Sequence, residues 1–191
     1  MTDQVANTVA PGPTVLVLAS GRGERFLASG GKTHKLWALL AGRTVLEHTL
    51  QAVRDSGLRW HLEERFHPGM GDSIAAAVRA TADATGWLVL PGDLPLLRSA
   101  TLLEVSAQLA AHDVVVPTYD GRRGHPVGFG RNCRQELLRL RGELGAAQVV
   151  RAHGASLLPV DDIGVVTDID TLEDLERAKV LLAAAPRNGA D

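Results

Sequence analysis

A short apolar run that breaks into a glycine-rich loop constrains this chain more than any other feature. Residues 15–18 are Val-Leu-Val-Leu, and Gly21 and Gly23 follow shortly afterwards. Valines and leucines bounded by turn residues predict a strand that is buried on both faces. Glycine lets backbone N–H groups face a ligand, because no Cβ stands in the way. The two parts together predict a strand that presents a ligand-binding loop at its carboxyl end.

Cationic side chains surround this predicted loop. Arg22 and Arg25 flank its second glycine, and Lys32 and Lys35 follow. Backbone amides combined with cations are what a polyphosphate requires. Short glycine-rich loops also occur as plain turns with solvated charges, and the motif alone does not separate these two interpretations.

Composition and length exclude several classes of protein. The 191 residues fit one domain, and a net charge of -2 indicates neither a nucleic acid nor a membrane surface as a partner. No apolar run approaches the roughly 20 residues of a membrane span. The single cysteine, Cys133, excludes an internal disulfide, so we expect a cytoplasmic protein. We expect a disordered leader at 1–13, the domain at 14–185 and a frayed tail at 186–191.

Strand and helix patterns alternate along the chain. Further strands are expected at 58–62, 86–90, 113–117, 156–160 and 165–169, and helices at 44–56, 74–84, 99–111, 134–139, 146–153 and 171–184. This alternation predicts an α/β domain with a mostly parallel sheet, joined by right-handed crossovers and flanked by helices. Segment 119–130 is expected to add an antiparallel element. Asp72 or Ser73 is expected to cap the helix at 74–84.

Acidic side chains follow two of the predicted strands. Asp93 comes after the strand at 86–90, and Asp168 and Asp170 close the strand at 165–169. Ligands of open α/β sheets bind beyond the carboxyl ends of the strands, where two acids can hold Mg2+. Each acid also has a purely structural interpretation. Asp93 could cap a turn, and Asp170 could be the N-cap of the last helix.

Five motifs in a fixed order carry a resemblance to a known family. They are Leu18-Ala19-Ser20-Gly21-Arg22-Gly23-Glu24-Arg25 with a later Lys35-Leu36, Gly69-Met70-Gly71-Asp72-Ser73-Ile74, Leu90-Pro91-Gly92-Asp93-Leu94-Pro95, Gly124-His125-Pro126-Val127, and Asp168-Ile169-Asp170-Thr171-Leu172-Glu173-Asp174-Leu175. Over about residues 14–183 the chain resembles the molybdenum-cofactor cytidylyl- and guanylyltransferases, the MobA-like NTP transferases. It is most similar to their cytidylyltransferase branch. The resemblance implies a single-domain, Rossmann-like nucleotidyltransferase fold of the GT-A-like type.

The resemblance also implies a role for each matching residue. Nucleotide binding falls to Leu18, Ala19, Ser20, Gly21, Arg22 and Gly23, and nucleotide or acceptor binding to Gly71, Asp72 and Ser73. The catalytic residues are Arg25 and Lys35, which would stabilise charge as pyrophosphate leaves, and Asp93. Asp93 would bind Mg2+ with Asp170, and Asp168 is a further candidate ligand. His125 would face the acceptor pocket, although it could equally be a turn histidine before Pro126.

The implied reaction moves a nucleoside monophosphate from a nucleoside triphosphate, with CTP favoured, to a phosphate-bearing acceptor. The implied acceptor is molybdopterin or its molybdenum form, and a molybdoenzyme is a further candidate partner. Two alternatives stay open at this point. One is transfer to a sugar phosphate or another small phosphate on the same sheet. The other is a non-catalytic protein that holds the cofactor for a molybdoenzyme.

The chain departs from the family pattern in two places. The segment between Arg25 and Lys35 is longer than usual, which leaves Lys32 as an alternative to Lys35. Only residues 58–67 separate the first long helix from the Gly-Met-Gly turn, too few for a strand, a helix and a second strand. We therefore predict that one βα unit is missing. A single strand at 59–63 should pair beside 15–18 as a sheet edge. We expect this edge to be blunted by the charges of Arg59, Glu63, Glu64 and Arg65, or covered by a second subunit.

Overall fold

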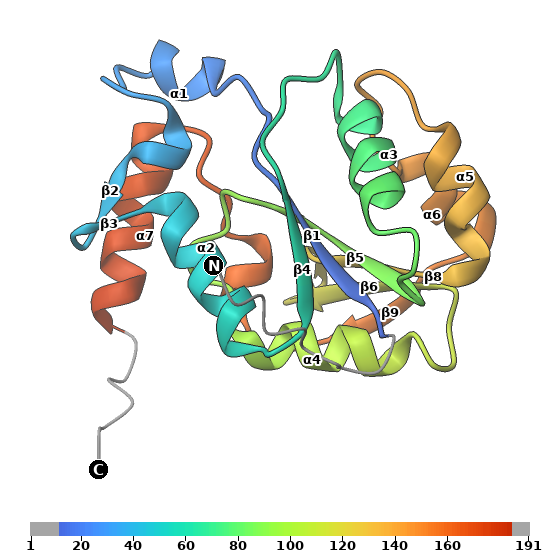
Figure 1. Ribbon diagram of the computed structural model, residues 1–191. Coiled ribbons are helices and arrows are strands. Elements are labelled where there is room, and N and C mark those ends of the chain that lie inside the picture. The colour runs from blue at the N-terminus through green and yellow to red at the C-terminus, as the bar shows by residue number, and fades with distance from the viewer. Residues whose placement is uncertain (1–11, 185–191) are drawn as a thin grey trace, which may run out of the picture.

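A central sheet organises the structure, a computed structural model whose described residues are 12–184 (Figure 1). In the described residues the strand order is β4-β1-β5-β8-β6-β7, and β9 also pairs with β6. The sheet strands are β1 (Thr14–Leu18), β4 (Arg59–Glu63), β5 (Gly86–Pro91), β6 (Val114–Tyr119), β7 (Arg122–Arg123), β8 (Val127–Gly130) and β9 (Ser156–Pro159). A separate hairpin is formed by β2 (Leu39–Leu40) and β3 (Arg43–Thr44).

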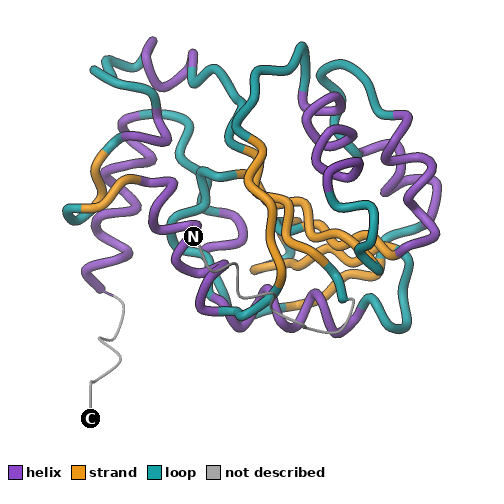
Figure 2. Tube along the Cα trace, in the orientation of Figure 1, coloured by secondary structure: helices purple, strands orange, loops and turns teal. Residues whose placement is uncertain are grey.

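Helices cover both faces of the sheet, as Figure 2 shows by secondary structure. The helices are α1 (Glu24–Ala28), α2 (Val45–Asp55), α3 (Met70–Ala80), α4 (Ser99–Gln108), α5 (Arg134–Arg139), α6 (Ala147–His153) and α7 (Leu172–Ala184), with 3-10 turns η1 (Lys35–Trp37), η2 (Arg131–Cys133) and η3 (Ile163–Val166). Strand β1 shows how the two layers arise. Val15 and Val17 pack with the core under α2, α4 and α7, whereas Leu16 packs with the core under α3, α5 and α6. Successive strand residues point to opposite faces, so one apolar run serves both cores.

The predicted fold class is confirmed. β1 pairs in parallel with both β4 and β5, and β6 pairs in parallel with β9. β8 runs antiparallel to both β5 and β6, as expected for segment 119–130. None of the described helices combines the length and the apolarity that crossing a membrane requires. Residues 1–11 of the expected leader, residue 185 and the expected tail lie outside the described residues.

Strand β4 confirms the prediction of a shortened sheet. It pairs with β1 from Thr14↔Arg59 to Leu18↔Glu63, and among the described residues it has no second partner strand. Arg59 at this edge forms an ion pair of 2.7 Å with Asp83. Glu63, which we also expected to blunt the edge, is instead buried at 1% exposure. Its Oε1 accepts a hydrogen bond from the backbone N–H of Arg65.

Two expectations about local structure were wrong. The predicted strand at 165–169 is instead the 3-10 turn η3 and an irregular segment, because Asp162 caps the turn through the N–H of Gly164. The predicted helix at 74–84 starts earlier, at Met70, with Gly69 at the N-cap in place of Asp72 or Ser73. The N–H of Gly71 donates to the Gly142 carbonyl, so the neighbouring loop satisfies a helix-end group.

Candidate functional site

A cleft lies at the carboxyl ends of β1 and β5. Its volume is about 490 Å3. It is lined by Leu18, Ser20, Gly21, Arg22, Gly23, Glu24, Arg25, Phe26, His34, Lys35, Leu36, His67, Pro68, Gly69, Met70, Ser73, Pro91, Gly92, Asp93, Glu143 and Asp170. Most of the residues predicted from the sequence are therefore brought together here. Ala19, Gly71, Asp72, His125 and Asp168 do not line this cleft.

The glycine-rich loop forms one wall of the cleft. Gly23 has a φ of 64° and begins α1 in the left-handed region, which glycine adopts without strain. The loop is joined to the next strand end, because the N–H of Gly92 donates to the carbonyl of Leu18 at 2.9 Å. Arg22 is exposed, lies 5.6 Å from the centre of the Phe66 ring and pairs loosely with Glu24 at 3.5 Å. An exposed cationic loop of this shape suits a polyphosphate.

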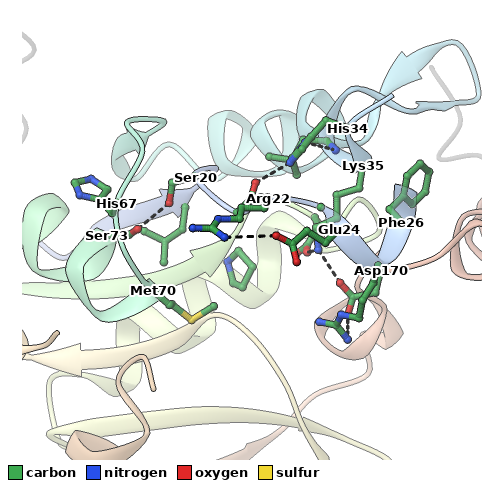
Figure 3. A pocket seen from close by; sticks show the side chains of 18 of the residues that line it. Ser20, Arg22, Glu24, Phe26, His34, Lys35, His67, Met70, Ser73 and Asp170 are labelled. Carbon is green, nitrogen blue, oxygen red and sulfur yellow. Dashed lines mark hydrogen bonds and ion pairs between the residues drawn. The ribbon is translucent and has the colours of Figure 1, made fainter. Parts of the chain in front are cut away.

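Four charged residues converge at one end of the cleft, which we call the charged end: Arg25, Lys35, Asp93 and Asp170. Figure 3 labels Lys35 and Asp170 at this end. Lys35 Nζ lies 2.5 Å from Asp93 Oδ2 and 2.7 Å from Asp170 Oδ1. Arg25 Nη1 lies 2.8 Å from the second oxygen of Asp170, Oδ2. The lysine therefore bridges two carboxylates that are 77 positions apart in the sequence, at 93 and 170.

The pKa values of Lys35 and Asp170 favour the ionised forms of these two side chains. Burial by itself lowers the pKa of Lys35, but Asp93 and Asp170 oppose it, and the net pKa is raised. Burial by itself raises the pKa of Asp170, but Lys35 and then Arg25 outweigh it, so the net pKa is lowered. Lys35 is thus held as an ammonium and Asp170 as a carboxylate.

Local structure leaves the two acids free to face the cleft. Asp93 follows β5, and its backbone carbonyl accepts the N–H of Ile169, which joins the segment of Asp170 to this strand end. The structural interpretation of Asp170 as a helix cap was wrong. Thr171 and Asp174 cap α7 reciprocally instead: Asp174 Oδ2 accepts the Thr171 N–H at 2.9 Å, and Thr171 Oγ1 accepts the Asp174 N–H at 3.2 Å.

The donor set of Asp93 and Asp170 fits a divalent cation that is shared with a ligand. Asp93 Oδ1 is buried without a hydrogen-bond partner in the described residues. Hard cations such as Mg2+ take carboxylate oxygens at one or two positions and fill the remainder with waters and substrate phosphates. No group of three or more His, Cys, Asp or Glu side chains in the described part of the chain is arranged to hold a metal. A cation at this position would therefore complete its coordination with waters or with oxygens of a bound ligand.

Asp168 and His125 lie beside this cleft. Asp168 is exposed in a second cleft that shares Arg25 and Asp170 with the first and also contains Arg122. Partial desolvation, and then the charges of Asp93 and Asp170, raise the pKa of Asp168. Burial lowers the pKa of His125, so the imidazole favours its neutral form. The backbone N–H of His125 donates to the Val165 carbonyl.

The opposite end of the cleft, which we call the serine end, is formed by Ser20, His67, Gly69, Met70 and Ser73 (Figure 3). Ser20 Oγ and Ser73 Oγ are 2.7 Å apart and join the glycine-rich loop to α3. Asp72, one residue earlier, instead accepts the N–H of Gly142 at 2.8 Å. A Cβ on Gly71 would lie 2.9 Å from the Arg141 backbone nitrogen. Asp72 and Gly71 therefore anchor the 141–145 loop, which contributes Glu143 to the cleft lining.

Sequence reasoning missed several cleft residues. His34 and His67 were assigned no role, because neither has metal-ligand spacing, and Glu143 belongs to a loop without a motif. The motif from Gly69 to Ile74 predicted Ser73 at the serine end, and the Pro68-Gly69 turn was the available signal for His67. Cys133 is excluded as a nucleophile, because it is buried and its pKa is raised to about 12.

A glycine-rich loop beside a lysine that bridges two acids defines a class of α/β protein that binds charged phosphate ligands at strand ends. A family model confirms this at the level of the sequence. Residues 15–157 match the MobA-like NTP transferase domain, and the chain belongs to this family.

Solved structures share the fold. Rv0371c from Mycobacterium tuberculosis H37Rv is 28% identical with a TM-score of 0.76, over 90% of this chain and 99% of that one. Molybdopterin-guanine dinucleotide biosynthesis protein A from Archaeoglobus fulgidus is 20% identical with a TM-score of 0.66, over 90% and 100% of the two chains, and supports the fold alone. The bifunctional protein GlmU of Xanthomonas axonopodis pv. citri (strain 306) is 31% identical over 144 residues, which are 63% of this chain and 30% of the relative. The chain thus spans about 30% of the length of that curated relative.

Proposed function

We propose that this protein transfers a nucleoside monophosphate from a nucleoside triphosphate to a phosphate-bearing acceptor and releases pyrophosphate. The observation that carries the proposal is Lys35, whose Nζ lies 2.5 Å from Asp93 and 2.7 Å from Asp170 at the mouth of the glycine-rich loop. Membership of the MobA-like NTP transferase family supports the same reaction. An acceptor oxygen attacks the α-phosphorus in line, and no covalent enzyme intermediate is required.

Different residues of the cleft bind the phosphates, stabilise the leaving group and contact the nucleoside. The amides of Gly21, Arg22 and Gly23 bind the phosphates, because a loop of successive N–H groups forms a concave anion site. Arg25 and Lys35 stabilise the charge that develops on the departing pyrophosphate. Leu18, Ala19 and Ser20 hold the nucleoside side of this loop, and Ser73 contacts the nucleotide across the serine end.

Asp93 and Asp170 would hold a divalent cation, for which Mg2+ is the first candidate. The cation would offset negative charge on the attacking and leaving oxygens. A crystal structure of the Mycobacterium tuberculosis protein Rv0371c, 26% identical to this chain, was determined in complex with manganese. That relative supports a divalent cation for this chain without selecting the metal.

The acceptor side is proposed at the second cleft, which meets the first at Arg25 and Asp170. Arg122 and Asp168 line this cleft, and His125 lies close enough to Asp168 for the carboxylate to affect its pKa. Molybdopterin is the first acceptor to test and CTP the first nucleotide. The name of the Archaeoglobus fulgidus relative supports a molybdopterin acceptor by analogy only.

A smaller phosphate acceptor is the second candidate, and the lining of the second cleft favours it. Among the described residues, that lining contains charged, hydroxyl and aliphatic side chains and no aromatic ring. A pterin ring usually requires an apolar or aromatic pocket of its own. A sugar phosphate, by contrast, can be held by charged and hydroxyl groups.

The experiment that tests nucleotide binding is a thermal-shift panel of CTP, GTP, ATP and UTP with and without Mg2+. A ligand that binds the native state alone raises the melting temperature by mass action. We expect at least one triphosphate to raise it, and to do so more in the presence of Mg2+. A panel without any shift would contradict the proposed function.

A further inference from the structure

His34 joins the glycine-rich loop to the turn that carries Lys35. Its Nε2 lies 2.7 Å from the carbonyl oxygen of Gly21. Its Nδ1 accepts the backbone N–H of Leu36 at 3.3 Å and thereby caps η1, whose first residue is Lys35. One ring thus contacts both parts of the site, and Figure 3 shows it between them.

The two contacts require a single tautomer. Nδ1 accepts a hydrogen bond, so it carries the lone pair, and the proton of the neutral ring lies on Nε2. That proton is then donated to the Gly21 carbonyl. Both interactions are satisfied at once, and the flipped ring or the other tautomer would lose at least one of them.

The contact to Gly21 also fixes an amide of the loop. The carbonyl of Gly21 and the N–H of Arg22 belong to the same planar trans peptide, so the two groups point in opposite directions. Because the carbonyl is directed at His34, the N–H of Arg22 is turned away from it. The ring therefore sets the orientation of one of the amides proposed to bind phosphate.

Gly23 supplies a second, independent observation that the ring is built into the loop. A Cβ at Gly23 would lie 2.9 Å from His34 Cδ2 and 3.0 Å from Nε2. The loop thus comes so close to the imidazole that a side chain at Gly23 would displace it. The close approach and the positive φ of 64° both require glycine at this position.

We propose that His34 is a positioning residue that locks the glycine-rich loop to Lys35, so that the loop amides and the ammonium meet a triphosphate in one fixed arrangement. This inference rests on the proposed function for the identity of the ligand. The lock itself is a property of the free protein, and it can be measured without any ligand.

Three substitutions separate the two contacts. In His34→Asn the side-chain oxygen reaches the position of Nδ1, keeps the cap on Leu36 and loses Gly21. In His34→Gln the side-chain amide reaches the position of Nε2 and keeps Gly21. His34→Ala loses both contacts. His48→Ala is the matched control, because His48 Nε2 also lies 2.7 Å from a backbone carbonyl, that of Leu40, away from the cleft.

The first measurement is amide hydrogen exchange of residues 20–25 in the free protein. We expect faster exchange in His34→Ala and His34→Asn, and exchange close to that of the unsubstituted protein in His34→Gln and His48→Ala. The second is calorimetric binding of CTP and of GTP with Mg2+. His34→Ala and His34→Asn should bind the nucleotide about 3- to 10-fold more weakly, which is the effect of one hydrogen bond. His34→Gln should bind it as the unsubstituted protein does.

Equal exchange rates and equal affinities in His34→Asn and His34→Gln would overturn the proposal. Such a result would mean that the ring only fills space and that its hydrogen bond to Gly21 does not matter. Unchanged exchange in His34→Ala would overturn it as well. If the unsubstituted protein binds neither nucleotide, the proposed function fails, while the exchange result still decides whether the lock exists.

Discussion

The two ends of the cleft are built in different ways. The charged end draws Lys35, Asp93 and Asp170 from three distant segments and joins them by ion pairs of 2.5 and 2.7 Å. In the described residues, the serine end is joined by hydrogen bonds of neutral groups: Ser20 Oγ and Ser73 Oγ are 2.7 Å apart, and Ser73 Oγ donates to the Gly69 carbonyl at 3.3 Å. It also has an exposed Met70 and lies beside the shortened part of the sheet.

This difference indicates that the charged end should carry out catalysis and that the serine end should select the nucleotide. Charges held in fixed positions in a partly buried site stabilise a developing charge without reorganisation. A neutral end with few internal contacts offers little to a phosphate but can accept a nucleobase. We therefore expect substitutions at the charged end to reduce turnover strongly, and substitutions at the serine end to change nucleotide affinity modestly.

The largest effect is expected for Asp93→Ala. The change removes a candidate metal ligand and one carboxylate partner of Lys35, so turnover should fall by more than about 1000-fold, beyond the loss of a single charge-stabilising donor. Turnover and the circular dichroism spectrum are measured together, with the exposed Asp83→Ala as the control. Near-normal turnover in a folded Asp93→Ala protein would remove Asp93 from the metal site.

The next effect separates the two lysines of the lengthened loop. Lys35→Ala should lower turnover by about 100- to 1000-fold, whereas Lys32→Ala should change it little, because Lys32 is exposed and outside the cleft lining. Steady-state kinetics on both variants decides the matter. A larger loss of turnover in Lys32→Ala would assign the catalytic role to Lys32 and contradict our description of the charged end.

A smaller effect is expected on metal binding. The Lys35 ammonium contacts both carboxylates, so a cation that takes both must compete with it. Lys35→Met should bind Mn2+ about tenfold more tightly than the unsubstituted protein in the absence of nucleotide, as followed by electron paramagnetic resonance. Lys32→Met is the control. Weaker Mn2+ binding in the Lys35 variant would show that the two acids are not the metal ligands.

The smallest effect is expected at the serine end. Ser73→Ala removes the link to Ser20 and one hydroxyl from the cleft wall, so nucleotide affinity should fall about 2- to 10-fold with turnover nearly unchanged. Titration calorimetry and kinetics measure the two quantities, and Ser106→Ala on α4 serves as the control. A loss of turnover as large as that of Lys35→Ala would contradict the assignment of catalysis to the charged end and of nucleotide affinity to the serine end.

The sequence predicted the parts of the site that depend on local pattern. The apolar run at 15–18, the strand before Asp93 and the edge strand at 59–63 all follow from residue type and segment length, and the structure contains each of them. The turn at 163–166 was missed, because its apolar residues look like a strand and its cap depends on the Asp162 side chain, which accepts the Gly164 N–H. His34 was missed for a related reason. Its role depends on a contact to Gly21, 13 positions earlier, and no local pattern encodes that contact.

Release of pyrophosphate tests the central claim most directly. The unsubstituted protein and Asp93→Ala are incubated with each of the four nucleoside triphosphates, Mg2+ or Mn2+, and either molybdopterin or a sugar phosphate as acceptor. The account predicts pyrophosphate from at least one combination, dependent on both metal and acceptor and absent in Asp93→Ala. Release of inorganic phosphate instead of pyrophosphate, or equal pyrophosphate release by Asp93→Ala, would contradict it.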